Sequence, residues 1–231
     1  SALGNGLSIE KDSTTGLKSR IRIINAPMLM LYSIAFNNDL FGADIDIFSL
    51  PKNNRIILET KDSSDFYPPK EISKMASWTN KNSYSYEIKL SKESESQSYK
   101  LIQQDLNRYL PFKAEIKKRE VKTLLLQSIS DKEILKTKDT ALPSFIHYNE
   151  DQSITFQNVG ITSLIVQLNY WNTNISTPII DGTNISSNID ITIHPKYNDI
   201  VSLNKELRRY GLILTESKRD IDMLIISDKV K

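Results

Sequence analysis

The feature that most constrains the fold is an internal repetition of strand and helix patterns. Residues 21–25 and 154–158 are both strand-like runs that end in asparagine, and the same offset aligns the apolar positions that follow them. In each copy these positions have a 3-1-3 spacing, which places four side chains on one face of a helix. They are Met28, Leu31, Tyr32 and Ala35 in the first copy, and Ile161, Leu164, Ile165 and Leu168 in the second. The pattern therefore predicts two similar units.

A second helix recurs in both copies with a 3-4-3 spacing of its apolar residues. Its positions are Tyr99, Ile102, Leu106 and Tyr109 in the first copy, and Ile200, Leu203, Leu207 and Tyr210 in the second. The following stretches, 112–126 and 212–226, share basic residues and then an apolar run. We expect each stretch to form a hairpin that closes its unit.

Four further runs rich in β-branched or aromatic residues predict strands at 55–60, 84–90, 178–181 and 189–193. The element order in each copy is then β-α-β-β-α-β-β. This order predicts an α+β fold of two tandem duplicated units, each an antiparallel or mixed sheet with two helices on one face. The alternative is that the two copies match by chance, because any amphipathic helix shows such a spacing of apolar residues.

The predicted boundaries follow from this alignment. Residues 1–18 are expected to be a linker or an artificial edge, and 19–130 the first repeat, with an insertion at about 60–83. Residues 131–152 form the joint, and 153–231 form the second repeat. The insertion contains Pro68, Pro69 and Trp78 and has no counterpart in the second copy.

Composition excludes several classes of function. The chain has no cysteine and two histidines, so thiol chemistry and a histidine-rich metal site are excluded, and we expect no metal and no cofactor. The net charge of +2 comes from 30 basic and 28 acidic residues that are mixed along the chain, which argues against a nucleic-acid partner. No apolar run approaches the roughly 20 residues of a transmembrane segment.

Aromatic residues give the strongest functional lead. Phe66, Tyr67 and Trp78 lie in the insertion, and Tyr170 and Trp171 follow the first helix of the second copy. Rigid rings beside prolines can receive an extended peptide or a sugar. The alternative is that these rings close the ends of the sheets as part of the core.

A second, polar group lies around the predicted strands of the second copy. Asp181, Thr183 and Asn184 follow one strand and form either a ligand loop or, as their residue types favour, a turn. Asp190 and His194 stand four residues apart, so they share one strand face and could act as an acid–base pair. The alternative for His194 is a partly exposed strand end.

The chain also resembles a bacterial domain family of unknown function, which is described as soil-associated and is found alone or behind TlpA-like thioredoxin domains. The resemblance rests on Trp78 with 86–88, on 101–113, on 119–126, and most closely on 179–190. Asn184 and Ser187 stand where the family usually has glycine, and Asn184 should tolerate the positive φ that such a turn requires. Each half is also similar to the short N-terminal domain of secretins and TonB-dependent receptors.

The resemblance implies a bacterial, extracytoplasmic setting, periplasmic or attached to the outer membrane. We therefore expect a non-catalytic binding or interaction module of the cell envelope, with a protein or peptide partner that could be a thioredoxin-like domain. The rival hypothesis is an accessory domain that positions the substrate of a TlpA-like thiol–disulfide oxidoreductase. A third hypothesis, hydrolysis at Asp190 and His194, requires both side chains in one pocket.

Overall fold

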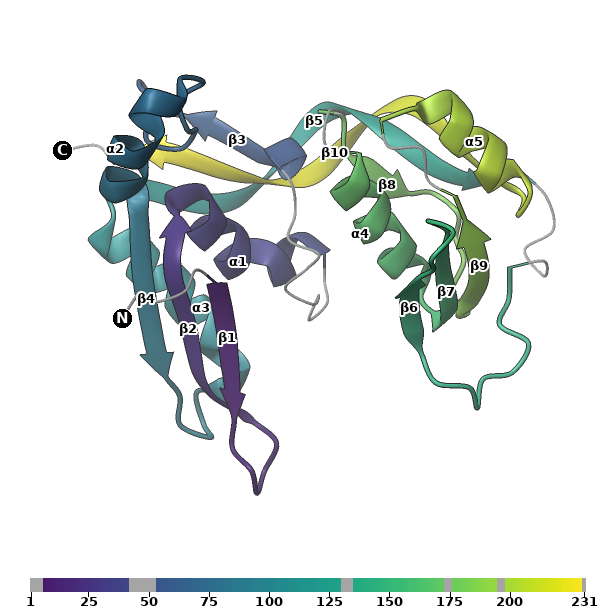
Figure 1. Cartoon of the computed structure of the whole chain (residues 1–231), viewed down its shortest axis with the longest axis horizontal. Helices are drawn as coiled ribbons and strands as arrows, with labels where there is room; N and C mark the ends of the chain where they lie inside the picture. The colour runs from purple at the N-terminus through teal and green to yellow at the C-terminus, as the bar shows by residue number, and fades with distance from the viewer. Residues whose placement is uncertain (1–5, 42–52, 130–134, 173–175, 195–197, 230–231) are drawn as a thin grey trace. The chain divides into compact units, whose positions relative to one another are not determined.

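The computed structural model describes residues 6–41, 53–129, 135–172, 176–194 and 198–229. Within these ranges the chain forms five α-helices and ten strands in three sheets, so it is a mixed α+β protein (Figure 1). The chain divides into two compact units. Unit 1 takes in residues 1–50, 56–117 and 223–231, and unit 2 takes in 51–55 and 118–222.

Unit 1 is built from two sets of paired strands and three α-helices. Its complete elements are β1 (Gly6–Lys11), β2 (Lys18–Pro27), α1 (Met28–Phe41), β3 (Ile56–Glu59), α2 (Ile72–Asn82), β4 (Ser83–Lys89), the short 3-10 helix η3 (Glu95–Gln97) and α3 (Ser98–Tyr109). The antiparallel sheet β1-β2-β4 has β2 at its centre. The second set contains β3, which runs parallel to the end of strand β10 (Leu212–Asp228), with Ile56 opposite Leu224.

Unit 2 follows the same plan of strand pairing. Its complete elements are the 3-10 helix η2 (Asn53–Arg55), β6 (Phe145–Tyr148), β7 (Ile154–Val159), α4 (Ile161–Trp171), β8 (Ile179–Asp181), β9 (Ile189–Ile193) and α5 (Ile200–Arg208). Strands β6-β7-β9 form an antiparallel sheet. Strand β8 runs parallel to the second part of β5 (Phe112–Ser128), with Ile179 opposite Leu124.

The two long strands β5 and β10 correct the prediction of closing hairpins. Each is a single strand of 17 residues, and each contributes its two halves to different units. They are neighbours and run antiparallel, since Ile129 N–H bonds Gly211 C=O and Lys229 N–H bonds Pro111 C=O. A physical reason is that 117–120 and 217–220 contain neither glycine nor proline, which are the strongest local signals of a turn.

The two cores are centred on the helices that the repeat predicted. All eight apolar residues of the 3-1-3 pattern are buried, and both α1 and α4 bury side chains around most of their circumference. A helix that is apolar on all sides is stable only when other elements cover it all round. The second helices bury only a stripe, and Tyr109, which was assigned to that stripe, is 75% exposed. It lies at the last residue of α3, where the helix no longer meets the core.

A local irregularity interrupts β2 and β7 at equivalent points. The pairing register shifts between Ile23 and Ala26 in β2, and between Phe156 and Val159 in β7. Within these shifts Asn25 has φ +50° and Asn158 has φ +51°. Asparagine tolerates this left-handed conformation, so both strands continue past the residue at which they were expected to end.

Three elements lie where no regular structure was expected. Strand β1 lies within the predicted linker 1–18, β6 within the predicted joint 131–152, and α2 within the predicted insertion 60–83. Strand β1 pairs with β2 and β6 pairs with β7, so both belong to the two antiparallel sheets. The sequence signal was weak because both are edge strands with mainly exposed or half-exposed residues.

Candidate functional site

The aromatic residues of the insertion have different degrees of burial. Phe66 is 2% exposed, and its ring lies 4.7 Å from that of Phe112 in the core of unit 1. The half-buried Trp78 lies on α2, and its indole N–H donates to the Ser64 carbonyl at 2.6 Å. Tyr67 is 41% exposed. A role of this group in partner contact stays a prediction.

The two aromatic residues of unit 2 also differ in how far they are buried. Trp171 is 6% exposed and packs edge-on against Phe156 and Tyr148, with ring centroids 6.0 and 6.2 Å apart. Tyr170 is 38% exposed. The contact role of this pair also stays a prediction.

Asp181, Thr183 and Asn184 form a turn that is stabilised by hydrogen bonds between its own polar atoms. The Asp181 Oδ1 accepts hydrogen bonds from both the backbone N–H and the hydroxyl of Thr183, each at 2.8 Å. Asn184 has φ +53°, a left-handed conformation that asparagine tolerates. Gly182 is required by packing, because a Cβ at this position would lie 2.6 Å from Leu125 Cγ.

Asp190 and His194 bond to different partners. The Asp190 Oδ1 accepts from the Thr137 hydroxyl at 3.0 Å and from the Asn158 N–H at 2.8 Å, and thereby fixes the irregular point of β7. The His194 Nε2 lies 3.3 Å from Asp151 Oδ2. No hydrogen bond or ion pair joins Asp190 to His194 in the ranges that the structure describes. The two side chains that were expected to form an acid–base pair are therefore not bonded to each other.

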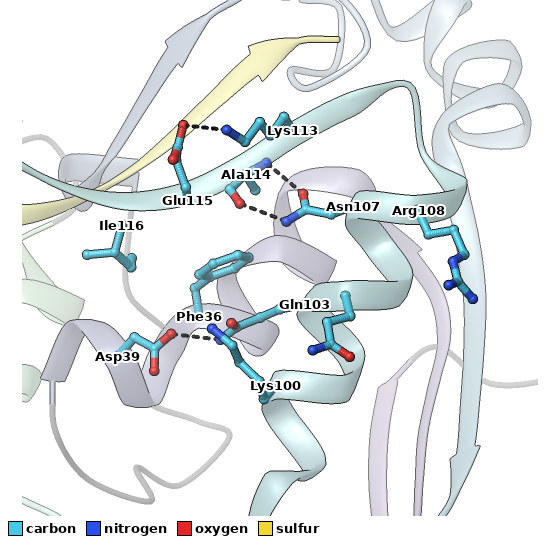
Figure 2. Close-up of a pocket in the computed structure, with 11 residues that line it drawn as sticks. Phe36, Asp39, Lys100, Gln103, Asn107, Arg108, Lys113, Ala114, Glu115 and Ile116 are labelled. Atoms are coloured by element: carbon cyan, nitrogen blue, oxygen red, sulfur yellow. Dashed lines mark hydrogen bonds and ion pairs between the residues drawn. The ribbon is translucent and has the colours of Figure 1, made fainter.

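An open cavity of about 720 Å³ lies in unit 1 (Figure 2). We call it the β5 groove, because the first part of β5 forms one wall and helices α1 and α3 form the other. The residues that line it come from all three elements: Phe36, Asp39, Lys100, Gln103, Gln104, Asn107, Arg108, Lys113, Ala114, Glu115 and Ile116.

Buried polar side chains fix the helical wall of the β5 groove. The Gln103 carboxamide is 4% exposed and donates to the Ala35 carbonyl at 2.9 Å and to Asp39 Oδ2 at 2.8 Å, which ties α3 to α1. Asn107 bonds both backbone groups of Ala114 and ties α3 to β5 (Figure 2). These hydrogen bonds fix the positions of the three elements that line the groove.

Three basic side chains, Lys100, Arg108 and Lys113, and two carboxylates, Asp39 and Glu115, line the groove. The Glu115 carboxylate lies 2.7 Å from Lys117 Nζ and 3.2 Å from Lys113 Nζ, and these hydrogen bonds, that of Lys117 first, lower the pKa of Glu115. Lys100 and Arg108 form no ion pair with any residue that the structure describes. The groove thus presents two cations outside any ion pair with a described residue, together with the Asp39 carboxylate, which accepts a hydrogen bond from Gln103.

Sequence reasoning missed the β5 groove. Lys100, Gln104 and Arg108 recur every four residues and resemble an ordinary solvent-facing stripe of a helix. The available signal was Gln103 and Asn107, two amides within that helix. Asparagine favours caps and turns over helix interiors when its side chain has no tertiary partner, so Asn107 was the stronger signal of the two.

The described residues include neither a membrane-spanning helix nor a cluster of metal ligands. No described helix has the length and apolar character needed to span a bilayer. No group of three or more histidine, aspartate or glutamate side chains in the described ranges is arranged to hold a metal ion.

The fold and groove define a protein of two α+β units with an open groove of mixed charge beside a sheet edge. The chain belongs to a family described as protein of unknown function (DUF3738), whose model matches residues 65–228. The matched range includes the groove residues of α3 and β5 and all of the described elements from β4 to β10. No curated protein and no solved structure matches the chain.

Proposed function

We propose that the chain is a non-catalytic binding module that holds a segment of a partner protein in the β5 groove. The observation that carries this proposal is the groove itself, an open cavity of about 720 Å³ with an apolar floor and a polar rim. Phe36, Ala114 and Ile116 supply the floor, while Lys100, Gln104 and Arg108 supply the rim. This combination is typical of sites that recognise peptides.

A displayed library of linear peptides tests this function on the whole chain. Gln104→Trp places a large ring into the groove from an exposed helix position, so the core is left intact. Lys205→Trp is the matched control, since Lys205 is an exposed position on α5 in unit 2. We expect wild type and the control to select related peptides, and the Gln104 variant to lose them. Selection of nothing above background by wild type, or of the same peptides by Gln104→Trp, would refute the function.

We further propose that this module works in the bacterial cell envelope, with a periplasmic or outer-membrane-attached partner. The support is the resemblance to domains found behind TlpA-like thioredoxin domains. Fractionation of the native host, with detection of the protein in periplasmic and membrane fractions, tests the setting. Recovery in the cytoplasmic fraction alone would contradict it.

We also propose that the two units descend from one duplicated unit. The support is their matching strand pairings: β1-β2-β4 corresponds to β6-β7-β9, and β3 with β10 corresponds to β8 with β5. Asn25 and Asn158 add a shared irregularity at equivalent positions. An experimental structure that gives the two units different topologies would overturn the duplication.

A further inference from the structure

Strand β4 has a free outer edge in unit 1. It is the last strand of the order β1-β2-β4 and pairs with β2 alone among the described strands (Figure 1). The N–H of Leu90, just past the end of β4, donates to the Ser19 carbonyl on β2. Because backbone groups alternate sides along a strand, those of Ser85, Glu87 and Lys89 point away from β2. No described residue bonds these outward backbone groups.

The apolar face of β4 is also incompletely covered. Tyr84, Tyr86 and Ile88 pack against the core of unit 1, but each is only half-buried. In unit 2, β9 pairs with β7 in the register in which β4 pairs with β2. The three counterparts on β9 are at most 2% exposed, and they are Ile189, Ile191 and Ile193. Unit 2 therefore has a cover at this edge that unit 1 lacks among its described residues.

Part of the cover in unit 2 is an extended segment. Residues 135–137 lie antiparallel to β9 on its outer side. The N–H of Thr137 donates to the Asn188 carbonyl at 2.9 Å, and the N–H of Asp190 donates to the Leu135 carbonyl at 2.8 Å. Leu135 is 1% exposed and belongs to the core of unit 2. One short segment with one large aliphatic side chain thus bonds the edge and completes the core.

Side chains close the remainder of the β9 edge. The Tyr210 hydroxyl donates to the Thr192 carbonyl at 2.8 Å and accepts from the Thr192 N–H at 3.1 Å. The N–H of His194 donates to the Glu206 carboxylate at 3.4 Å. Tyr109 holds the place of Tyr210 in the 3-4-3 pattern of unit 1, but it is 75% exposed. The corresponding edge of β4 therefore stays open.

A polar anchor for the covering segment is present in both units. In unit 2, Asp190 Oδ1 accepts from the Asn158 N–H at 2.8 Å and from the Thr137 hydroxyl at 3.0 Å. Ser85 takes the place of Asp190 in unit 1, and its Oγ accepts from the Asn25 N–H at 3.2 Å. A serine hydroxyl has a second lone pair and a donor as well. It can therefore also bond the hydroxyl of an incoming segment.

We propose that the outer edge of β4 takes an extended segment of a partner protein, which adds as an antiparallel strand. The segment carries a large aliphatic residue and, two positions later, a threonine or serine, as residues 135–137 do on β9. Backbone hydrogen bonds supply the affinity of such strand addition, and the side chains supply its specificity. The edge residues of β4 do not line the β5 groove, so this inference goes beyond the proposed function.

Hydrogen exchange tests the open edge before any ligand is added. We expect the amides of Ser85 and Glu87 to exchange at least about 100 times faster than that of Ile88, which faces β2. In unit 2, the amides of Asp190 and Thr192 should exchange slowly, because both are bonded. Slow exchange of Ser85 and Glu87 in the free protein would show that the edge is already covered, and would overturn the inference.

A peptide with the sequence of residues 132–139 is the probe for binding. It is added to the whole chain, and binding is measured by fluorescence anisotropy. We expect saturable binding that slows the exchange of the Ser85 and Glu87 amides. An analogue with aspartate in place of the leucine should bind at least about tenfold more weakly, because a buried carboxylate is costly. Equal binding of the analogue would contradict the proposed pairing.

Backbone methylation of the probe tests for strand addition without altering the protein. In the arrangement seen on β9, the leucine and threonine amides of the probe face β4, whereas the isoleucine amide and that of the lysine between them face away. Methylation of the first pair should abolish binding, and methylation of the second pair should leave it within about threefold. Equal effects of both pairs would overturn the strand arrangement.

Variants of the protein provide a matched comparison. Glu87→Pro removes an outward N–H, a change that edge strands tolerate, and should weaken probe binding at least about tenfold. Glu87→Thr loses the same ion pair with Arg22 but keeps the N–H, so it should bind as wild type does. Gln104→Trp, which blocks the β5 groove, should also bind normally. Thermal unfolding confirms that each variant is folded, and the methylated probes decide the question if Glu87→Pro is not.

The outcomes separate this inference from the proposed function. Peptides from the library that Gln104→Trp loses belong to the β5 groove, and those that Glu87→Pro loses belong to the β4 edge. The inference fails if the probe does not bind and Glu87→Pro loses no library peptide, or if Gln104→Trp abolishes probe binding. A concentration-dependent dimer that Glu87→Pro abolishes would show that a second copy of the chain occupies the edge, and would also overturn the inference.

Discussion

The side chain of Asn107 makes with Ala114 the two hydrogen bonds that a neighbouring strand would make. Its Oδ1 accepts from Ala114 N–H at 2.7 Å, and its Nδ2 donates to Ala114 C=O at 2.8 Å. In unit 2, Asn204 does the same with Leu214, at 2.7 and 3.0 Å. Both asparagines therefore close part of an edge strand from the adjacent helix, and edges closed in this way resist unwanted pairing.

Asn107→Ala should destabilise the protein, because both backbone groups of the buried Ala114 lose their partner. An unsatisfied buried group costs about 1–3 kcal/mol, and we expect a loss in that range in the free energy of unfolding by urea. Gln104→Ala, at an exposed position one turn earlier, should change this free energy by less than about 0.5 kcal/mol. A loss no larger than that of the control would mean that water replaces the amide.

Gly182→Ala should be destabilising because the new methyl group would overlap Leu125 Cγ and Cδ1, each 2.6 Å away. Overpacking of this kind costs about 1–3 kcal/mol. In a Leu125→Ala background the obstructing atoms are gone, so the same substitution should cost clearly less. Thermal unfolding of the four proteins of this cycle measures the coupling. Additive effects would contradict the packing argument.

Tyr32→Phe should leave the stability unchanged or raise it by up to about 1 kcal/mol. The Tyr32 ring is fully buried, and its hydroxyl has no hydrogen-bond partner among the described residues. Removal of an unsatisfied buried group of this kind costs nothing in the folded state. Urea denaturation at neutral pH measures the difference, and a clear loss of stability would show that the hydroxyl is bonded.

The same residue predicts a dependence of stability on alkaline pH. Burial, with a smaller contribution from Tyr84, raises the pKa of Tyr32 in the folded protein. Above about pH 10 the unfolded chain releases this proton while the folded protein keeps it, so stability falls as the pH rises. Tyr32→Phe should show a shallower fall between about pH 9 and 11. Tyr109→Phe, at a position 75% exposed, is the control and should follow wild type.

Asn158 should not tolerate glycine, although its backbone conformation favours it. Asn25 and Asn158 both have positive φ, so alanine should cost about 1–2 kcal/mol at either position. Glycine accepts this backbone and should cost less than alanine at Asn25. The Asn158 side chain also donates to Leu142 C=O at 2.7 Å and accepts from Asn188 Nδ2 at 2.8 Å, so Asn158→Gly should remain destabilising. Chemical denaturation of the four variants measures this contrast.

The sequence predicted well those parts of the fold in which apolar residues recur with a clear period. The 3-1-3 patterns located α1 and α4, and the β-branched run at 189–193 gave β9 with its observed bounds. The long strands β5 and β10 were divided into hairpins because the basic residues near 118 and 218 break the apolar pattern, although they do not turn the chain. Hydrophobic pattern alone does not distinguish an exposed stretch of strand from a turn.

The candidate site was harder to predict because it depends on long-range contacts. Gln103 bonds Ala35 and Asp39, which precede it by more than 60 residues, and no local pattern indicates such a contact. The aromatic residues were predicted to contact a partner because large rings at surfaces often bind ligands. Phe66 and Trp171 are instead almost wholly buried, and burial of this kind is decided by the whole fold.

The division of β5 and β10 between the two units bears on how the protein can be made. Unit 1 contains residues 223–229 as well as its first segment, so its sheet lacks a central strand until those residues leave the ribosome. Domains commonly fold one after another during translation, starting from the N-terminus. Here the first unit must wait for residues 223–229, so it should not complete its fold before all of unit 2 has been synthesised.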